Sequence, residues 1–159
     1  MKRAARRNLL AAGVAAVTGS LSWTHAAHAQ AQRATSSGDP GREALRKAYD
    51  AAVVMKQQAQ SSGDQPYGAV VVVDGEIAGE GASRVVKDNN PNAHAERVAI
   101  REAQRRLARQ DLRGAILVST SRPCSLCEEA AAQAGIARMV HGADLTDAGA
   151  PRTPNTSRR

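Results

Sequence analysis

The sequence predicts an α/β domain in which helices cover both faces of a mixed β-sheet. Segments with the apolar spacing of helices alternate along the chain with short apolar runs that are typical of strands. Asp74-Gly75 separates two such runs and is typical of a two-residue hairpin turn. Farther along, a strand, a helix and a strand follow one another, and this order requires a parallel pair. The expected architecture is therefore a three-layer α/β/α sandwich.

The first helix and the hairpin are expected at the start of this domain. A helix is predicted over residues 42–60, because apolar side chains recur on one stripe: Leu45, Ala48, Tyr49, Ala52 and Met55. The polar residues 61–64 end this helix. Residues 69–73 form a continuous apolar run, so we expect a strand that is covered on both faces. The returning strand of the hairpin is predicted at residues 76–81.

Two further pairs of a helix and a strand complete the predicted sheet. One helix is expected over residues 93–109, and a second begins at Pro123, a residue suited to the first turn of a helix. The strands that follow them are predicted at residues 115–119 and 136–141. The chain ends soon afterwards, so the predicted sheet has about four strands and lacks a fifth. An uncovered sheet edge invites pairing with another subunit, and we therefore expect a homodimer.

The most informative motif is His94-Ala95-Glu96, followed by Pro123-Cys124-Ser125-Leu126-Cys127. One imidazole and two thiolates are zinc ligands, and three protein ligands leave the fourth tetrahedral position open for water. Glu96 remains as a carboxylate that can move protons. It lies on the apolar face of its helix, where a carboxylate is costly unless something there needs it. Cys124 and Cys127 share a face at a helix N-terminus, where the helix dipole favours ionised thiols. The motif predicts a hydrolytic zinc site.

Each part of this motif also has a simpler interpretation. The pair Cys124 and Cys127 alone is typical of a redox dithiol, and His94 alone of a buried core histidine. Glu96 alone is typical of a first-turn acid that the helix dipole stabilises. A dithiol needs no His-x-Glu segment upstream, however, and a structural zinc site needs a second short-spaced Cys or His pair, which the chain lacks. A catalytic metal site accounts for all of these residues together.

Over roughly residues 42–148 the chain resembles the cytidine-deaminase-like superfamily. The order His-x-Glu and then Pro-Cys-x-x-Cys is typical of its zinc deaminases. Three segments look most like the bacterial guanine deaminases and tRNA adenosine deaminases: Pro66-Tyr67-Gly68-Ala69, Asn90-Pro91-Asn92-Ala93-His94-Ala95-Glu96 and Pro123-Cys124. The resemblance implies zinc-dependent hydrolytic deamination of a nucleobase or nucleoside. Guanine or a related purine is the favoured substrate.

The resemblance also implies roles for individual residues. His94, Cys124 and Cys127 would bind Zn²⁺, which lowers the pKa of its bound water toward neutrality. Glu96 would take a proton from that water and return it to the departing ammonia. Contacts with the substrate are expected from four residues: Tyr67, Ala69, Ser83 and Asp147.

The chain departs from the pattern of these families at two positions near the motif. Ser83 stands where an Asn usually hydrogen-bonds the base, and Arg122 stands where a Glu usually precedes Pro-Cys. Two alternatives therefore stay open beside the purine deaminase. One is a catalytically silent zinc-binding protein with the deaminase fold, although the intact Glu96 argues against it. The other is an enzyme like the tRNA adenosine deaminases.

Both ends of the chain are expected to lie outside the deaminase domain. Residues 1–29 have the features of a twin-arginine signal peptide, with Arg6-Arg7, a mildly apolar stretch and an Ala27-His28-Ala29 cleavage site. Residues 30–41 and 149–159 are polar and are predicted to be a disordered leader and a disordered tail. The protein is therefore expected to be exported to the periplasm, which argues against tRNA as its substrate.

The charge of the chain indicates a small-molecule partner. Removal of the four basic residues of the signal lowers the formal net charge from +7 to +3. No stripe of Lys and Arg with interleaved aromatic residues occurs, so nucleic acid is not expected as a partner. No second apolar run approaches 18 residues, so no membrane span is expected after removal of the signal. A purine or pyrimidine base or nucleoside fits these properties.

Overall fold

The structure is a computed structural model of the chain, and it describes residues 40–153. The predicted signal peptide, nearly all of the leader and the last six residues of the tail lie outside the described residues. Within the described range the helices are α2 (Pro40–Ser61), α3 (Ala95–Arg106) and α4 (Ser125–Gln133). The strands are β1 (Gly68–Val73), β2 (Glu76–Ala82), β3 (Ile116–Ser119), β4 (Arg138–His141) and β5 (Thr146–Gly149). None of the helices in this range combines the length and apolarity that a membrane span needs.

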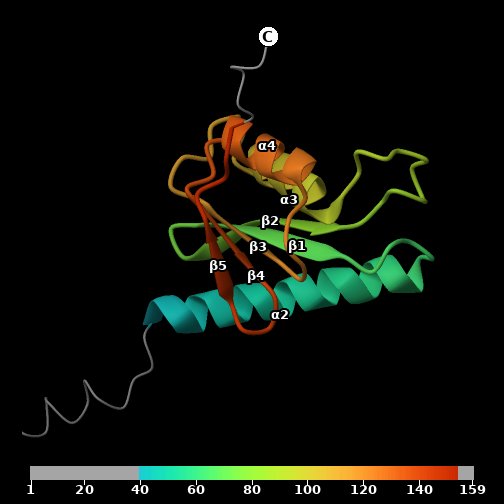
Figure 1. Ribbon diagram of the computed structural model, residues 1–159, viewed down its shortest axis with the longest axis horizontal. Helices are drawn as coiled ribbons and strands as arrows, with labels where there is room; N and C mark the ends of the chain where they lie inside the picture. Colours follow the sequence, from blue (N-terminus) through green and yellow to red (C-terminus); the bar gives the residue numbers. More distant parts are fainter. Residues whose placement is uncertain (1–39, 154–159) are drawn as a thin grey trace, which may run out of the picture. The chain divides into compact units, whose positions relative to one another are not determined.

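The strands form one mixed sheet in the order β2-β1-β3-β4-β5 (Figure 1). β1 is antiparallel to both β2 and β3, while β3 and β4 are parallel on either side of α4 in the chain, as predicted. The hairpin turn between β1 and β2 is also confirmed. Asp74 and Gly75 have φ values of 52° and 85°, and positive φ at both central residues defines the type I′ turn that fits a two-residue hairpin.

The sheet is covered on both faces, which confirms the three-layer prediction. Figure 1 shows α2 on one face of the sheet and α3 with α4 on the other. The side chains of β1 alternate between the two layers. Val70 and Val72 pack in one core cluster with Ala48 and Ala52 of α2. The intervening residues belong to the second cluster, which α3 and α4 complete. The unbroken apolar run of β1 therefore reflects burial on both sides.

The prediction that the sheet lacks a fifth strand is wrong. β5 pairs antiparallel with β4, after a turn in which Gly142 and Leu145 have φ values of 74° and 55°. β5 consists of Thr-Asp-Ala-Gly, which has no apolar alternation for sequence analysis to find. The homodimer prediction was argued from an uncovered β4, and β5 removes that premise. The homodimer remains a prediction that light scattering of the zinc-loaded protein tests.

The two helices of the motif begin two residues later than predicted. His94 is the N-cap of α3, and Cys124 is the N-cap of α4. Both residues have an extended backbone, with ψ values of 150° and 169°. Pro123 therefore precedes the N-cap and does not lie in the first helical turn. The first ligand of each motif segment thus sits at the junction between a loop and a helix.

Close packing of α3 on β2 fixes the position of the first motif helix. Gly79 and Gly81 of β2 face the backbone of α3 directly. A Cβ atom at Gly81 would collide with the carbonyl oxygen of Ala95 and the amide nitrogen of Ala99. Because only glycine leaves room for this approach, β2 sets how deeply the N-terminus of α3 lies in the domain.

Candidate metal centre and substrate pocket

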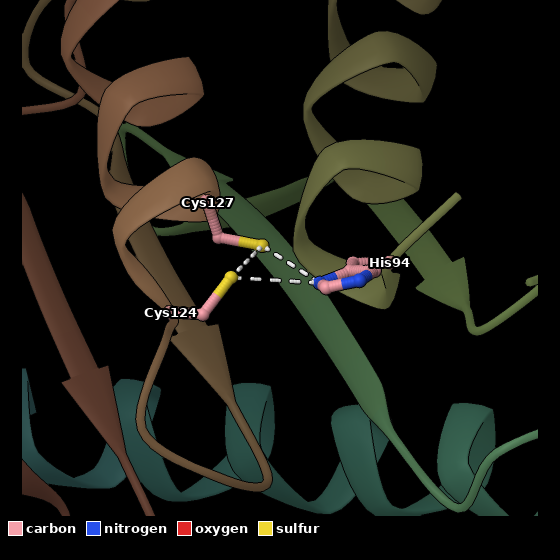
Figure 2. A group of neighbouring side chains, drawn as sticks. All are labelled: His94, Cys124 and Cys127. Carbon is pink, nitrogen blue, oxygen red and sulfur yellow. Dashed lines mark hydrogen bonds between the residues drawn. The ribbon is translucent and has the colours of Figure 1, made fainter. Parts of the chain in front are cut away.

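Three potential metal ligands meet where the N-termini of α3 and α4 approach each other (Figure 2). His94 and Cys124 are the N-caps of these helices, and neither side chain caps its own helix by a hydrogen bond. Both side chains are therefore available for another partner. Cys127 follows one turn into α4 and is buried, whereas Cys124 is exposed. One side of the ligand group is therefore buried at Cys127, and the other side is open to solvent at Cys124.

The distances within this group fit a tetrahedral zinc ion. The sulfur atoms of Cys124 and Cys127 lie 3.5 Å apart. Nδ1 of His94 lies 3.6 Å from the sulfur of Cys124 and 3.4 Å from that of Cys127. Tetrahedral zinc with Zn–S bonds of about 2.3 Å and Zn–N bonds of about 2.05 Å requires edges of about 3.8 Å between sulfurs and about 3.6 Å between sulfur and nitrogen. The three residues therefore fit Zn²⁺, with Nδ1 as the ligating nitrogen of His94.

Burial and charge at Cys127 favour a bound cation. Burial raises the pKa of the Cys127 thiol, and the nearby carboxylate of Glu96 raises it further. A thiolate at this position therefore needs a positive partner, and a metal ion supplies one because metal ligation deprotonates thiols. The described residues offer no ion pair to this thiol. The need of this thiolate for a cation and the distances among the three ligands therefore both indicate a bound metal ion.

Glu96 lies in the first turn of α3, beside the metal ligands. Only 5% of its surface is exposed, and its Oε2 lies 3.5 Å from the sulfur of Cys127. Burial raises the pKa of the Glu96 carboxyl, while its own backbone N–H, Cys127 and His94 oppose that rise. No lysine or arginine in residues 40–153 forms an ion pair with Glu96. A carboxyl with this surrounding can hold or release a proton inside the site.

A cavity of about 440 Å³ opens over the metal ligands and Glu96. Its lining comes from the loop before β1, the loop after β3 and the two helix N-termini: Gln65, Tyr67, His94, Glu96, Ser121, Arg122 and Cys124. A second cavity, of about 580 Å³, lies between α2 and the β1–β2 hairpin and includes no residue of the metal centre. The smaller cavity is therefore the candidate substrate pocket.

The structure brings one of the four predicted substrate residues to this pocket. Tyr67 lines the cavity and is 43% exposed, so its ring is accessible to a base. Ala69 lies in the core, and Asp147 lies on β5, 3.0 Å from Arg138. Ser83 is buried, and its hydroxyl donates a hydrogen bond to a carboxylate outside the pocket. The predicted substrate contacts of Ala69, Ser83 and Asp147 stay predictions that these placements do not support.

Asp64 is the carboxylate that receives the Ser83 hydroxyl, and it connects the two segments that lead to the site. The backbone N–H groups of Gln65, Val86 and Lys87 also donate to it, over 2.8–2.9 Å. Burial alone would raise the pKa of Asp64, but these donors outweigh burial and lower it to about 2. Asp64 therefore holds the loop before β1 against the loop that leads to His94.

Gln65 and Ser121 line the pocket although no sequence motif indicates them, and Arg122, which departs from the family pattern, lines it too. These residues lie outside the helices and strands, where apolar periodicity carries no signal. The antiparallel pairing of Ala69 with Ser119 brings the two loops to one end of the sheet. If the pairing of β1 with β3 could be predicted from the sequence, it would place Gln65, Ser121 and Arg122 at the same end of the sheet.

Residues 42–143 match the family described as the cytidine and deoxycytidylate deaminase zinc-binding region. The chain is 41% identical to the guanine deaminase of Bacillus subtilis (strain 168) over 83 residues, which cover 52% of this chain and 53% of that protein. It is 37% identical to the tRNA-specific adenosine deaminase of Buchnera aphidicola subsp. Schizaphis graminum over 89 residues, which cover 56% and 59% of the two chains. The matched segment thus spans less than two thirds of each of these relatives.

Solved structures show the same similarity in three dimensions. The X-ray structure of guanine deaminase from Bacillus subtilis superposes with a TM-score of 0.57 and 36% identity, covering 61% of this chain and 62% of that one. A structure from studies of tRNA:A34 deaminases, which edit A to I at the wobble position of transfer RNA, gives a TM-score of 0.59 and 34% identity. That match covers 60% of this chain and 70% of the other. Both comparisons agree with the observed α/β fold.

Proposed function

Because the chain belongs to the family with the cytidine and deoxycytidylate deaminase zinc-binding region, we propose that it is a zinc-dependent hydrolase that deaminates a nucleobase or nucleoside. The observation that carries this proposal is the group of three zinc ligands beside a buried carboxyl, of which His94, Cys124 and Glu96 line one pocket. Guanine or a related purine is the favoured substrate, since a guanine deaminase and tRNA-specific adenosine deaminases are among the relatives.

In this proposal the residues divide the work of hydrolysis. His94, Cys124 and Cys127 hold Zn²⁺, which when bound supplies a water molecule that ionises near neutral pH. Glu96 accepts a proton released in the pocket and donates it to the amino group that leaves. The raised pKa of Glu96 suits both halves of this role, because efficient proton transfer needs a pKa near the working pH.

The pocket also offers a surface for the base itself. A base is normally held between aromatic or apolar side chains in deaminases. Tyr67 is the aromatic residue in the lining of this pocket, and its exposed ring can stack on a purine. A base stacked on Tyr67 would lie in the same cavity as Glu96.

One observation favours a second candidate, a catalytically silent zinc-binding protein. Ser83, at the position where related enzymes usually read the base through an Asn, directs its hydroxyl to Asp64 and does not line the pocket. Without this contact a base would be held less firmly in the orientation that hydrolysis needs, which favours binding without turnover. The buried Glu96 opposes this candidate, because a silent site has no use for a proton-carrying carboxyl at a cost in desolvation.

Ammonia release tests the proposed function. The zinc-loaded chain without residues 1–29 is incubated with guanine, adenine, cytosine, their nucleosides and tRNA. Release from a base or nucleoside is the expected result, and it names the substrate. Release from tRNA alone would favour the alternative enzyme like the tRNA adenosine deaminases. Silence across the whole panel, with one zinc bound per chain, would favour the silent protein.

We further propose that the chain is exported in folded form through the twin-arginine route. Zinc bound before export would protect the two thiolates from forming a disulfide in an oxidising compartment. The sulfur atoms lie only 3.5 Å apart, so unprotected thiols are placed to react. Thiol titration of protein recovered from the periplasm should find both cysteines reduced and metal-bound. A disulfide in the active fraction would contradict this proposal, and would support a periplasmic dithiol.

A further inference from the structure

We propose that a cavity between α3 and α4 binds a phosphate group, at a site separate from the substrate pocket. The cavity has a volume of about 340 Å³, and its lining shares no residue with the pocket over the metal ligands. Figure 1 shows α3 and α4 together on one face of the sheet. The ligand is inorganic phosphate or the phosphate monoester of a small molecule. It would lie between the two helices that carry the metal ligands.

Cationic and amide side chains line this cavity, and no acidic residue does. Arg97, Arg101 and Gln104 come from α3, Gln110 from the loop after it and Gln133 from α4. The other lining residues are apolar: Ile100, Ala130 and Ala134. A guanidinium matches a phosphate group in a bidentate geometry, and amide N–H groups can donate to its remaining oxygens. The donor set therefore fits an oxyanion that has several acceptor atoms.

Arg97 is held at this cavity without an acceptor for its buried nitrogen. The side chain is half-buried, and its Nε has no hydrogen-bond partner. Among residues 40–153 no other buried side-chain nitrogen or oxygen lacks a partner. Burial of a charged donor without an acceptor destabilises the folded state. A negative charge in the cavity would offset this cost, because the positive charge of a guanidinium is delocalised over its three nitrogens.

Arg101 adds a second positive charge one helical turn farther along α3. Residues four positions apart on a helix are neighbours, so the charges of Arg97 and Arg101 repel each other. Neither side chain has a carboxylate partner within the described part of the chain. The other two arginines of α3 do have one, since Arg105 and Arg106 both lie 2.7 Å from Glu102. A bound phosphate would relieve the repulsion between the two unpaired cations.

The remaining acidic residues of α3 and α4 do not supply the missing negative charge. Glu96 lines the substrate pocket. Glu128 lies 3.4 Å from Arg152, and Glu129 accepts a hydrogen bond from the side-chain amide of Gln133 over 3.3 Å. Neither Glu128 nor Glu129 lines the cavity. The anion that this cavity fits is therefore a bound ligand and not a side chain of these helices.

Calorimetric titration of the zinc-loaded protein with inorganic phosphate, at low ionic strength, tests the site. One phosphate per chain is the expected result. Arg101→Gln, at an exposed position, should weaken the binding about tenfold, the value of one charge-assisted hydrogen bond, and Arg97→Gln should do the same. Arg122→Gln is the matched control, because Arg122 is an exposed arginine of the other pocket, and it should retain the affinity for phosphate.

A charge reversal separates the loss of a ligand contact from the loss of the fold. In Arg101→Glu the new carboxylate lies one helical turn from Arg97 and takes the place of the anion. Phosphate binding should disappear, while the melting temperature in phosphate-free buffer should rise by about 2–4 °C, because a repulsive pair becomes an attractive one. Arg113→Glu is the control: Arg113 lies 2.6 Å from Asp111, so this reversal should lower the melting temperature and leave phosphate binding unchanged.

Glycerol 3-phosphate distinguishes the two sources of the phosphate group. Tighter binding of this monoester than of inorganic phosphate identifies a phosphorylated small molecule, and weaker or equal binding identifies the free ion. Tighter binding of a trinucleotide than of either would overturn the site, because a phosphodiester chain would then bind to the charged surface and not in the cavity.

Two further results would overturn the site. One is the absence of saturable binding at millimolar phosphate. The other is an affinity that Arg101→Gln leaves unchanged, because phosphate would then bind at the zinc ion or elsewhere. None of these titrations needs turnover, so a protein without deaminase activity can still bind phosphate here, and an active deaminase can fail to do so. The inference and the proposed function therefore stand or fall separately.

Discussion

The hydroxyl of Ser83 donates a hydrogen bond to the carboxylate of Asp64 over 2.8 Å, in the interior of the protein. Ser83 follows β2, and Asp64 precedes β1, so this bond joins the two ends of the hairpin. Asp64 also accepts hydrogen bonds from the backbone of Val86 and Lys87, in the loop that leads to His94. In this chain Ser83 therefore helps Asp64 to hold the loop that leads to the metal ligand His94.

Ser83→Ala should lower the free energy of unfolding by about 1 kcal/mol, because the buried Asp64 loses one hydrogen bond. Urea unfolding of the zinc-loaded protein measures the change. Ser61→Ala, at an exposed position of α2, is the matched control and should change stability by less than about 0.5 kcal/mol. Unchanged stability together with a raised KM for Ser83→Ala would instead place the hydroxyl at the substrate.

Asp64 should make the stability depend on pH in the acid range. Its pKa in the folded protein is about 2, compared with an ordinary value of 3.8. A carboxyl with a lowered pKa stabilises the folded state above its ordinary pKa, and this contribution is lost as the pH falls toward the folded value. The urea midpoint of the wild type should therefore exceed that of Asp64→Asn above about pH 4, and the two should converge toward about pH 2. A constant difference across this range would contradict the role of the Asp64 charge.

Gly81→Ala should destabilise the domain by about 1–3 kcal/mol, because the new methyl group collides with the backbone of α3. Since α3 carries His94 and Glu96, the displacement should also weaken zinc binding. Calorimetric zinc titration and urea unfolding measure the two effects. Glu80→Ala, at the neighbouring and partly exposed position, is the control and should cost no more than the surface ion pair with Arg106, about 1 kcal/mol or less. Full zinc affinity in Gly81→Ala would show that the close packing does not set the metal site.

His94→Ala should abolish stoichiometric zinc binding, because two thiolates remain from a set of three ligands. His141→Ala is the matched control, since His141 lies on β4 outside the ligand group, and it should retain one zinc per chain. Metal analysis after dialysis measures both variants. One zinc per chain in His94→Ala would reject the proposed ligand set.

Zinc affinity should rise with pH over the range in which the protein stays folded. Burial raises the pKa of the Cys127 thiol, so this thiol is protonated in the metal-free protein and must lose its proton to bind zinc. Titrations in buffers of different ionisation enthalpy count the protons released. Zinc binding without proton release would contradict a thiolate ligand at Cys127.

The helices and four of the five strands could be predicted because each has a side-chain pattern imposed by burial. β1 is apolar throughout because α2 covers one of its faces and α3 with α4 cover the other. β5 could not be predicted in this way, since it is held by backbone pairing with β4 and its residues are largely exposed. α3 and α4 begin two residues later than predicted, because the extended N-caps His94 and Cys124 leave no trace in apolar periodicity.

The metal centre could be predicted from residue types and spacing, because zinc ligation restricts the chemistry to few side chains. The substrate pocket could be predicted only in part. Tyr67 could be predicted because it directly precedes the first strand, near the motif. Gln65 and Ser121 line the pocket because β1 pairs with β3, which the sequence does not reveal. The buried bond between Ser83 and Asp64 depends on tertiary contacts between segments 19 residues apart, which no local pattern reports.

Ammonia release by Glu96→Gln, compared with the wild type at equal zinc content, tests the central claim most directly. The substitution keeps the size of the side chain and removes its ability to carry a proton, so the rate should fall by about 10²- to 10⁴-fold while one zinc stays bound. Glu102→Gln, at an acidic residue on the same helix outside the pocket, should retain the wild-type rate. Undiminished release by Glu96→Gln would contradict the account of a zinc deaminase that uses Glu96 to move protons.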